Sequence, residues 1–181
     1  MFERLPRKST RLTGYDYSQD GAYFVTICTF NREILFGEIV NGDMRLNQTG
    51  EIVLACWNDL PNHYPQAEYD LFVIMPNHIH AIVILFDDNR TPSLNRREGH
   101  RPSPTETMRA KKRGLSQIIG SLKSYSAKRI NERRGMTGVA VWQRSFHDHI
   151  IRDEADFNIR RNYILNNPSR WQEDADNPMK R

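Results

Sequence analysis

The sequence predicts an α+β fold in which amphipathic helices cover an antiparallel sheet. Short runs rich in β-branched and aromatic residues alternate with apolar stripes at helical spacing, and Gly and Pro signals separate them. The 181 residues have the length of one ordinary domain, and 38% apolar residues with 10% aromatics are enough for a core. We therefore expect one folded domain with one site.

One strand and one helix are predicted in the first third of the chain. Residues 23–30 are rich in β-branched and aromatic side chains, which is typical of a strand. A turn signal follows at residues 41–43, and apolar residues recur at helical spacing over 50–60. We expect this helix to end at Pro61, because proline does not continue a helix.

Two further strands follow. Residues 69–75 and 78–86 are apolar runs, and the pair Pro76-Asn77 separates them. This pattern predicts a tight reversal between two buried antiparallel strands at the centre of the sheet.

The second half of the chain begins with an expected loop. Residues 87–114 combine prolines and charges without periodicity, so we expect a mobile basic loop there. An amphipathic helix is predicted from Leu115, and a strand over 139–152. Asp153 is expected to cap a last helix, which ends before Pro168.

The predicted order is strand, helix, strand, strand, helix, strand, helix. The first six elements form a ferredoxin-like split βαβ arrangement, with helices on one face of an antiparallel sheet, and the last helix is appended. We expect residues 1–20 to be a lead-in, 21–171 to be the domain with 87–114 inserted, and 172–181 to be a tail.

Composition argues against several classes of protein. The longest apolar run, 81–86, is far shorter than the roughly 20 residues that cross a bilayer, so no membrane partner is expected. No apolar stretch follows the basic N-terminus, which indicates a cytoplasmic protein rather than a secreted one. Cys28 and Cys56 lie far apart without CxxC spacing, and we expect buried free thiols.

Positive charge is concentrated in one part of the chain. The net charge is +4, but residues 89–134 hold 13 Lys and Arg against three acids, and the remainder is net negative. Such a block is typical of proteins that bind phosphates, although a solvated basic loop is the alternative. The candidate nucleic-acid contacts on the helix after the loop are Lys123, Lys128 and Arg129.

A histidine pair marks the start of the strand over 78–86. Side chains of a strand alternate between its faces, so His78 and His80 point the same way, about 7 Å apart at Cα. Two imidazoles at that spacing can share one cation, whereas Ile79 points into the other face. Alone, such a pair is more often two ordinary histidines than a metal site.

A tyrosine and an asparagine near the end of the last helix are the second candidate pair. Tyr163 and Asn167 are four residues apart and share one helix face. A hydroxyl nucleophile and an amide oxygen could thus both face a cation held by the two histidines. The alternatives are a core tyrosine and an asparagine that caps the helix.

Three separated segments, MPNHIHAIVIL, WQRSFHDHIIRDE and RRNYILNNPSRW, resemble in their order and spacing the HUH single-tyrosine transposases of IS200/IS605 type. They resemble most the REP-associated tyrosine transposases. The resemblance implies that His78, His80 and Asn167 bind a divalent metal and that Tyr163 is the nucleophile. It further implies nicking and strand transfer on single-stranded or hairpin DNA through a 5′-phosphotyrosine intermediate.

The candidate metal ligands and the resemblance also allow expectations about the metal, the DNA contacts and the oligomeric state. Oxygen and nitrogen ligands without thiolate favour Mg²⁺ or Mn²⁺ in work on nucleic acid. The basic residues Lys123, Lys128 and Arg129 would bind DNA phosphates with salt-dependent affinity. Relatives in the resembling families act as dimers or as monomers, and a homodimer and a monomer both stay open.

Two further residues compete for roles. Tyr125 is a rival nucleophile, but it coincides with an apolar stripe and Arg129 stands four residues on, so we interpret it as a packing residue. His149 is left as a neighbour of the active site without an assigned role. The alternative functions are a catalytically silent nucleic-acid-binding module and a metal-dependent phosphodiesterase that uses water.

Overall fold

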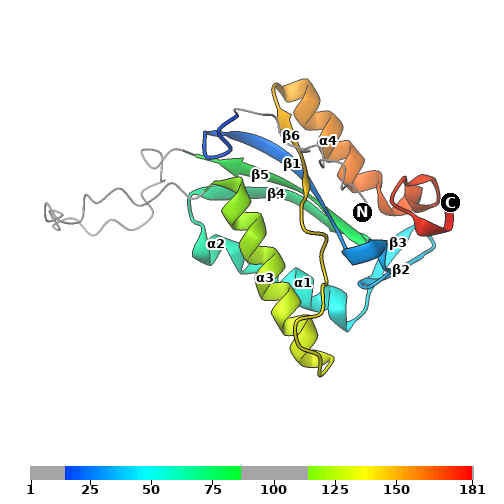
Figure 1. Cartoon of the computed structure of the whole chain (residues 1–181). Coiled ribbons are helices and arrows are strands. Elements are labelled where there is room, and N and C mark those ends of the chain that lie inside the picture. Colours follow the sequence, from blue (N-terminus) through cyan, green and yellow to red (C-terminus); the bar gives the residue numbers. More distant parts are fainter. Residues whose placement is uncertain (1–14, 87–113, 181) are drawn as a thin grey trace, which may run out of the picture.

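The computed structural model describes residues 15–86 and 114–180, and the statements below concern these residues. A four-stranded antiparallel sheet lies at the centre of the molecule (Figure 1). Its strands, in spatial order, are β4 (Ala67–Ile74), β5 (His78–Leu85), β1 (Gly21–Cys28) and β6 (His147–Ile151). Since β5 is antiparallel to both of its neighbours, β1 and β4 run parallel with β5 between them. The predicted α+β, ferredoxin-like arrangement is confirmed.

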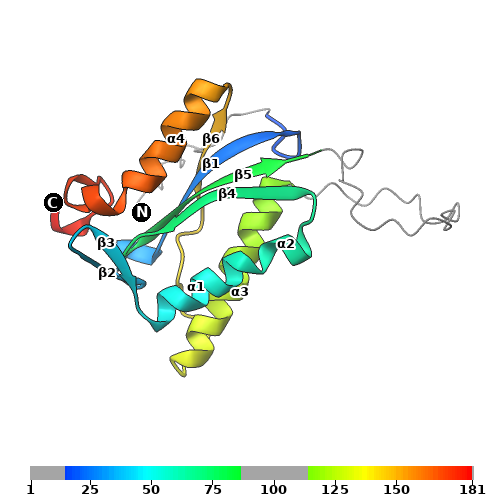
Figure 2. The same ribbon diagram turned by 180° about the vertical axis from the view of Figure 1, so that it is seen from behind.

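Helices cover both faces of the sheet. One face packs against α1 (Gln48–Asn58), α2 (Leu60–His63) and α3 (Leu115–Arg133), whereas the appended helix α4 (Glu154–Asn166) lies across the other face (Figure 2). The large core beneath α1 and α3 includes Tyr23, Val25 and Ile27 of β1. A small second cluster of Phe24, Ile82, Ile151 and Ile164 joins the sheet to α4.

The alternation of side chains along β1 and β5 sorts residues between the two layers. Ile79, Ala81 and Val83 enter the large core, and Ile82 enters the small one. Because β5 is buried on both faces, its sequence is a continuous apolar run. His78 and His80 share the face of Ile82 and therefore lie under α4.

A hairpin that the sequence analysis recognised only by its turn follows β1. Strands β2 (Gly37–Val40) and β3 (Asp43–Leu46) pair antiparallel around Asn41 and Gly42. Both turn residues have positive φ, 55° and 85°, which fits a tight hairpin turn and the preference for Asn-Gly there.

Two predicted boundaries are wrong. The helix over 50–60 does not end at Pro61: α1 ends at Asn58, and Pro61 lies in the first turn of α2, where its missing N–H costs nothing. The strand predicted over 139–152 is reduced to β6. Trp142 forms only an isolated bridge with Thr29, although Trp142 and Phe146 are buried, so their apolar character reflects packing of an irregular segment.

The last helix begins and ends as predicted. The Asp153 side chain accepts a hydrogen bond from the backbone N–H of Asp156 at 2.8 Å, and Asn167 is the C-terminal cap before Pro168. Two short 3₁₀ helices, η3 (Pro168–Glu173) and η4 (Pro178–Lys180), follow.

Other expectations meet the structure only in part. Cys28 and Cys56 are buried free thiols, as predicted. Among the described residues, no helix is long and apolar enough to cross a membrane. The lead-in up to residue 14 and the basic loop over 87–113 lie outside the described residues.

Candidate active site

The two histidines of β5 lie buried beneath α4, with their imidazoles turned toward each other. The side chain of His78 is fully buried and that of His80 nearly so. Their Nε2 atoms are 3.0 Å apart. The same-face placement expected from strand alternation is therefore what the structure shows, and both nitrogens face one point.

Hydrogen bonds on the far side of each ring determine which nitrogen is available. Asn77 donates through Nδ2 to the backbone oxygens of Arg32 and Asp176, so its Oδ1 must accept from His78 Nδ1, 2.8 Å away. The hydroxyl of Thr26 lies 2.8 Å from His80 Nδ1 and can accept its proton. With both protons on Nδ1, both Nε2 lone pairs point into the site, as metal ligation requires.

Burial keeps both imidazoles neutral. Desolvation, followed by the charge of Arg32, lowers the pKa of His78 to about 3. Desolvation and the neighbouring His78 also hold the pKa of His80 well below its ordinary value, against a smaller opposite effect of Asp174. At neutral pH each ring therefore carries a single proton and keeps one unprotonated nitrogen.

Asp174 adds a carboxylate that the sequence analysis did not identify. One ligand atom from each of His78, His80 and Asp174 lies within 4.8 Å of the others, and Asp174 Oδ2 is 4.0 Å from His78 Nε2. Asp174 follows η3 in a segment without periodicity, so no spacing in the sequence associates it with the histidines.

Hydrogen bonds and an ion pair hold the segment after α4 next to the histidine pair. Asp176 forms an ion pair with Arg32, and its backbone oxygen accepts a hydrogen bond from Asn77 at 2.7 Å. Asn177 donates to the backbone oxygen of Trp171 at 3.0 Å. These contacts hold the turn that presents Asp174.

Asn167 lies next to Asp174 at the C-terminal end of α4. Its side chain is buried, and its Oδ1 makes no hydrogen bond among the described residues. Its Nδ2 donates to Asp174 Oδ2 at 3.3 Å, so the amide lies beside the carboxylate. A buried amide oxygen without a partner is costly unless a ligand satisfies it. The two imidazoles and the Asp174 carboxylate form a group that could hold a metal ion.

Tyr163 lies above this group. Its ring is 5.1 Å from that of His80 and 5.8 Å from that of Phe24, centroid to centroid, while 43% of the residue stays exposed. Burial and the Asp174 carboxylate raise the pKa of Tyr163, and the Asn167 amide and Arg160 act in the opposite direction. The hydroxyl is therefore protonated at neutral pH.

A cavity of about 300 Å³ opens beside the tyrosine at the end of α4. Its lining residues come from α4 and the segment after it, and they are Tyr163, Asn166, Asn167, Arg170, Glu173, Asp174 and Ala175. The cavity thus brings together Tyr163, Asn167 and Asp174 along its lining.

The predicted DNA contacts lie elsewhere, on α3 across the sheet from α4. The Lys123 ammonium donates to the backbone oxygens of Gln143, Arg144 and Ser145, at 2.7 to 3.2 Å. Lys128 pairs with Glu132. The structure does not bring these cations to the tyrosine, and their role in DNA binding stays a prediction.

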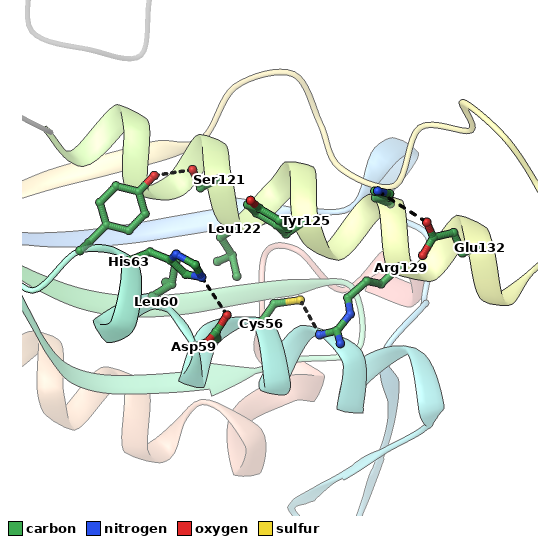
Figure 3. Close-up of a pocket in the computed structure, with 11 residues that line it drawn as sticks. Cys56, Asp59, Leu60, His63, Ser121, Leu122, Tyr125, Arg129 and Glu132 are labelled. Atoms are coloured by element: carbon green, nitrogen blue, oxygen red, sulfur yellow. Dashed lines mark hydrogen bonds and ion pairs between the residues drawn. The ribbon is translucent and has the colours of Figure 1, made fainter.

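Tyr125 is not a core residue, which corrects its interpretation as packing. It is 60% exposed and stacks on His63, with ring centroids 6.2 Å apart. Both line a cavity of about 530 Å³ between α1, α2 and α3, where Arg129 also reaches the sulfur of Cys56 (Figure 3). This cavity is on the opposite face of the sheet from Tyr163.

The comparisons with known proteins concern the fold and the sequence. No family model matches the chain. The fold is that of a REP-associated tyrosine transposase: a solved structure of one, bound to a REP hairpin, has a TM-score of 0.57 over 89% of this chain and 74% of that chain, at 18% identity. A crystal structure of a candidate transposase from Deinococcus radiodurans R1 has a TM-score of 0.45 and 14% identity over 86% and 96% of the two chains.

In sequence, the chain is 38% identical over 170 residues to a Haemophilus influenzae protein described as "Uncharacterized protein". The matched region covers 93% of this chain and 91% of that protein. The chain belongs to the same family as that Haemophilus protein. The resemblance to tyrosine transposases that the sequence predicted is confirmed at the level of the fold.

Proposed function

We propose that this protein nicks single-stranded DNA next to a hairpin and transfers the strand through a covalent phosphotyrosine, in a metal-dependent reaction. The observation that supports this most is the position of Tyr163, half exposed above a buried, neutral histidine pair. The unpartnered oxygen of Asn167 lies one helical turn further on. A protein of this fold binds a REP hairpin, which supports hairpin DNA as the substrate.

The nucleophile is the hydroxyl of Tyr163. Its oxygen forms a bond to phosphorus while the bond from phosphorus to the 3′ oxygen breaks; the phenolic proton passes to solvent, and the leaving oxygen takes up a proton. The products are a 5′-phosphotyrosine and a free 3′-OH. Attack of another 3′-OH on the linkage rejoins DNA and releases the tyrosine, so no external energy source is needed.

Four residues would hold the cation: His78, His80, Asn167 and Asp174. When bound, Mg²⁺ or Mn²⁺ would supply positive charge for the phosphate oxygens. The chain itself contributes the position of the nucleophile, because Ile164 anchors α4 to the sheet. It also contributes the unprotonated state of the ligands, through burial and through Asn77 and Thr26.

Cleavage of labelled single-stranded hairpins from the DNA flanking the gene tests this function. The protein, Tyr163→Phe and the matched control Tyr125→Phe are incubated with Mg²⁺ or EDTA and resolved on denaturing gels. We expect a covalent adduct that needs metal, disappears in Tyr163→Phe and persists in Tyr125→Phe.

The two alternative functions give other results. Binding of the hairpins without any adduct would indicate a catalytically silent binding module. Cleavage that survives Tyr163→Phe would indicate hydrolysis by water, or attack by Tyr125 if the Tyr125→Phe variant is the inactive one.

A further inference from the structure

Three side chains beside Tyr163 form a connected polar cluster that the proposed chemistry does not use. His149 of β6 donates from Nε2 to Asp156 Oδ2 at 2.7 Å, and Arg160 Nε donates to Asp156 Oδ1 at 3.1 Å. Arg160 Nη2 lies 3.3 Å from His149 Nε2. Both oxygens of one carboxylate are thus engaged, and they fix an arginine of α4 against an edge strand of the sheet.

The cluster lies on the same sheet face as the tyrosine. His149 is the cross-strand neighbour of Phe24, and the guanidinium carbon of Arg160 is 5.6 Å from the centre of the Phe24 ring. The same ring stacks on His80 and contacts Tyr163. Arg160 and Tyr163 are three residues apart on α4 and therefore share a helix face.

The guanidinium of Arg160 can still bind an anion. Asp156 engages its Nε. Because His149 Nε2 carries the proton that it donates to Asp156, it cannot also accept one from Arg160 Nη2, so the hydrogen bonds described for Arg160 use one of its five N–H donors. Its side chain is 30% exposed, so part of it reaches solvent. A planar guanidinium of this kind matches two oxygens of a phosphate.

The neighbouring arginine provides a contrast. Arg161 Nε contacts Asp70 Oδ2 of β4 at 3.2 Å, and its guanidinium lies 5.9 Å from the centre of the Phe157 ring. Arg161 thus points toward β4, whereas Arg160 points toward β6. Arg160 and Arg161 therefore carry the same charge at adjacent positions, but only Arg160 lies beside Tyr163.

We propose that Arg160 is a phosphate-binding residue of the active site, and that it binds a backbone phosphodiester of the strand that Tyr163 attacks. Asp156 and His149 are positioning residues that hold it in place. The proposal rests on the proposed function for the identity of the strand. Because the Arg160 guanidinium is held in position before DNA binds, its side chain loses little conformational entropy on binding. A fixed positive group of this kind is most effective beside a phosphate on which negative charge develops during the reaction.

Cleavage kinetics form the first test. Arg160→Gln, Arg160→Lys and the control Arg161→Gln are compared in single-turnover adduct formation at saturating DNA, with thermal unfolding to verify folding. We expect Arg160→Gln to slow the reaction by about 10- to 100-fold, Arg160→Lys to recover part of the rate, and Arg161→Gln to stay within about twofold. Equal rates in Arg160→Gln and Arg161→Gln would overturn the proposal.

The second test identifies the phosphate and does not require cleavage. In the Tyr163→Phe background, hairpin DNAs with one uncharged methylphosphonate at successive positions near the cleavage site are bound with and without Arg160→Gln. We expect one position at which the two changes are not additive, because each removes the same contact. Additive losses at every position would refute the assignment of Arg160, even if no adduct is ever seen.

The positioning residues have their own readout. His149→Ala and Asp156→Asn should lower the cleavage rate only while Arg160 is present, and should add nothing to Arg160→Gln. If they lower the rate equally in both backgrounds, their role is not the positioning of Arg160. If the wild-type protein formed no covalent adduct, that result would contradict the proposed function. The methylphosphonate binding test would still decide whether Arg160 binds a phosphate.

Discussion

The rings of Tyr163 and His80 lie nearly perpendicular, at 71°, with their centroids 5.1 Å apart. The first belongs to the appended helix and the second to a central strand, so the contact depends on how α4 docks on the sheet. Ile164, the next residue of α4, is buried in the small cluster that makes this docking. The position of Tyr163 above the two histidines is therefore set by packing.

The first prediction concerns Asp174, a candidate metal ligand whose carboxylate only the structure places beside the histidines. Asp174→Asn removes a negative charge beside His78 and should weaken Mn²⁺ binding by at least about tenfold, measured by calorimetry. The control is Glu173→Gln, an exposed carboxylate paired with Arg170, which should leave the affinity unchanged. Equal affinities in the two variants would show that Asp174 is not a ligand.

A second prediction separates the two tasks of Asn77. Asn77→Ala removes two hydrogen bonds to partly buried backbone oxygens and the acceptor for His78, so the free energy of unfolding should fall by about 1–3 kcal/mol. Mn²⁺ affinity should fall by about 10- to 100-fold.

Asn77→Asp keeps an acceptor for His78 but cannot donate to the two oxygens. It should lose stability while it retains metal affinity, as seen in denaturant unfolding and calorimetry. Asn62→Ala, which removes an exposed hydrogen bond to Asp59, should change neither. If Mn²⁺ affinity fell equally in Asn77→Ala and Asn77→Asp, acceptance of the His78 proton by the Asn77 side-chain oxygen would not be what supports metal binding.

The third prediction follows from the lowered pKa values of His78 and His80. As the pH falls below about 6.5 the unfolded chain binds protons at these histidines. In the folded chain the pKa of His78 is lowered to about 3 and that of His80 is held well below its ordinary value, so stability present at pH 8 is lost as the pH falls. From pH 8 to pH 5, in EDTA, we expect the free energy of unfolding to drop by about 2 kcal/mol per histidine.

Urea unfolding at several pH values measures this dependence. His80→Gln should remove about half of the drop, because one of the two proton-linked groups is gone. His147→Gln, at an exposed position on β6, is the control that should keep the full drop. A pH dependence that His80→Gln leaves intact would mean that other groups cause it.

Local pattern predicted the parts of the site that lie within one element. Strand alternation placed His78 and His80 on one face, and helical spacing placed Tyr163 and Asn167 on another. The capping of α4 by Asp153 was also local and came out as predicted. Such features depend on the chain within a few residues.

The parts that the sequence did not reveal depend on contacts between distant segments. Asp174 reaches the histidines because Arg32 and Asn77 hold the turn around Asp176, and no periodicity records that. The face that α4 covers and the irregular path of residues 139–146 likewise follow from tertiary packing. Tyr125 occupied a position of the apolar stripe of α3 yet lies exposed at a cavity, because α2 presents His63 to it there.

The fourth prediction tests the basic face of α3. Removing Lys128 and Arg129 together should reduce the slope of log affinity for hairpin DNA against log salt by about 1.5, since each lost phosphate contact lowers it by about 0.7–0.9. The rate of adduct formation at saturating DNA should not change, because these residues lie across the sheet from Tyr163. Arg161→Ala is the control, since Asp70 already neutralises that charge.

Lys123 should behave differently from this pair. Its ammonium donates to three backbone oxygens of residues 143–145, so Lys123→Met should lower the free energy of unfolding by about 1–3 kcal/mol. The salt slope should change by less than in the double variant. Filter binding over a salt series and urea unfolding of the same preparations separate the two effects. If the double variant of Lys128 and Arg129 kept the wild-type slope of log affinity against log salt, DNA would contact the α4 side of the sheet and not the basic face of α3.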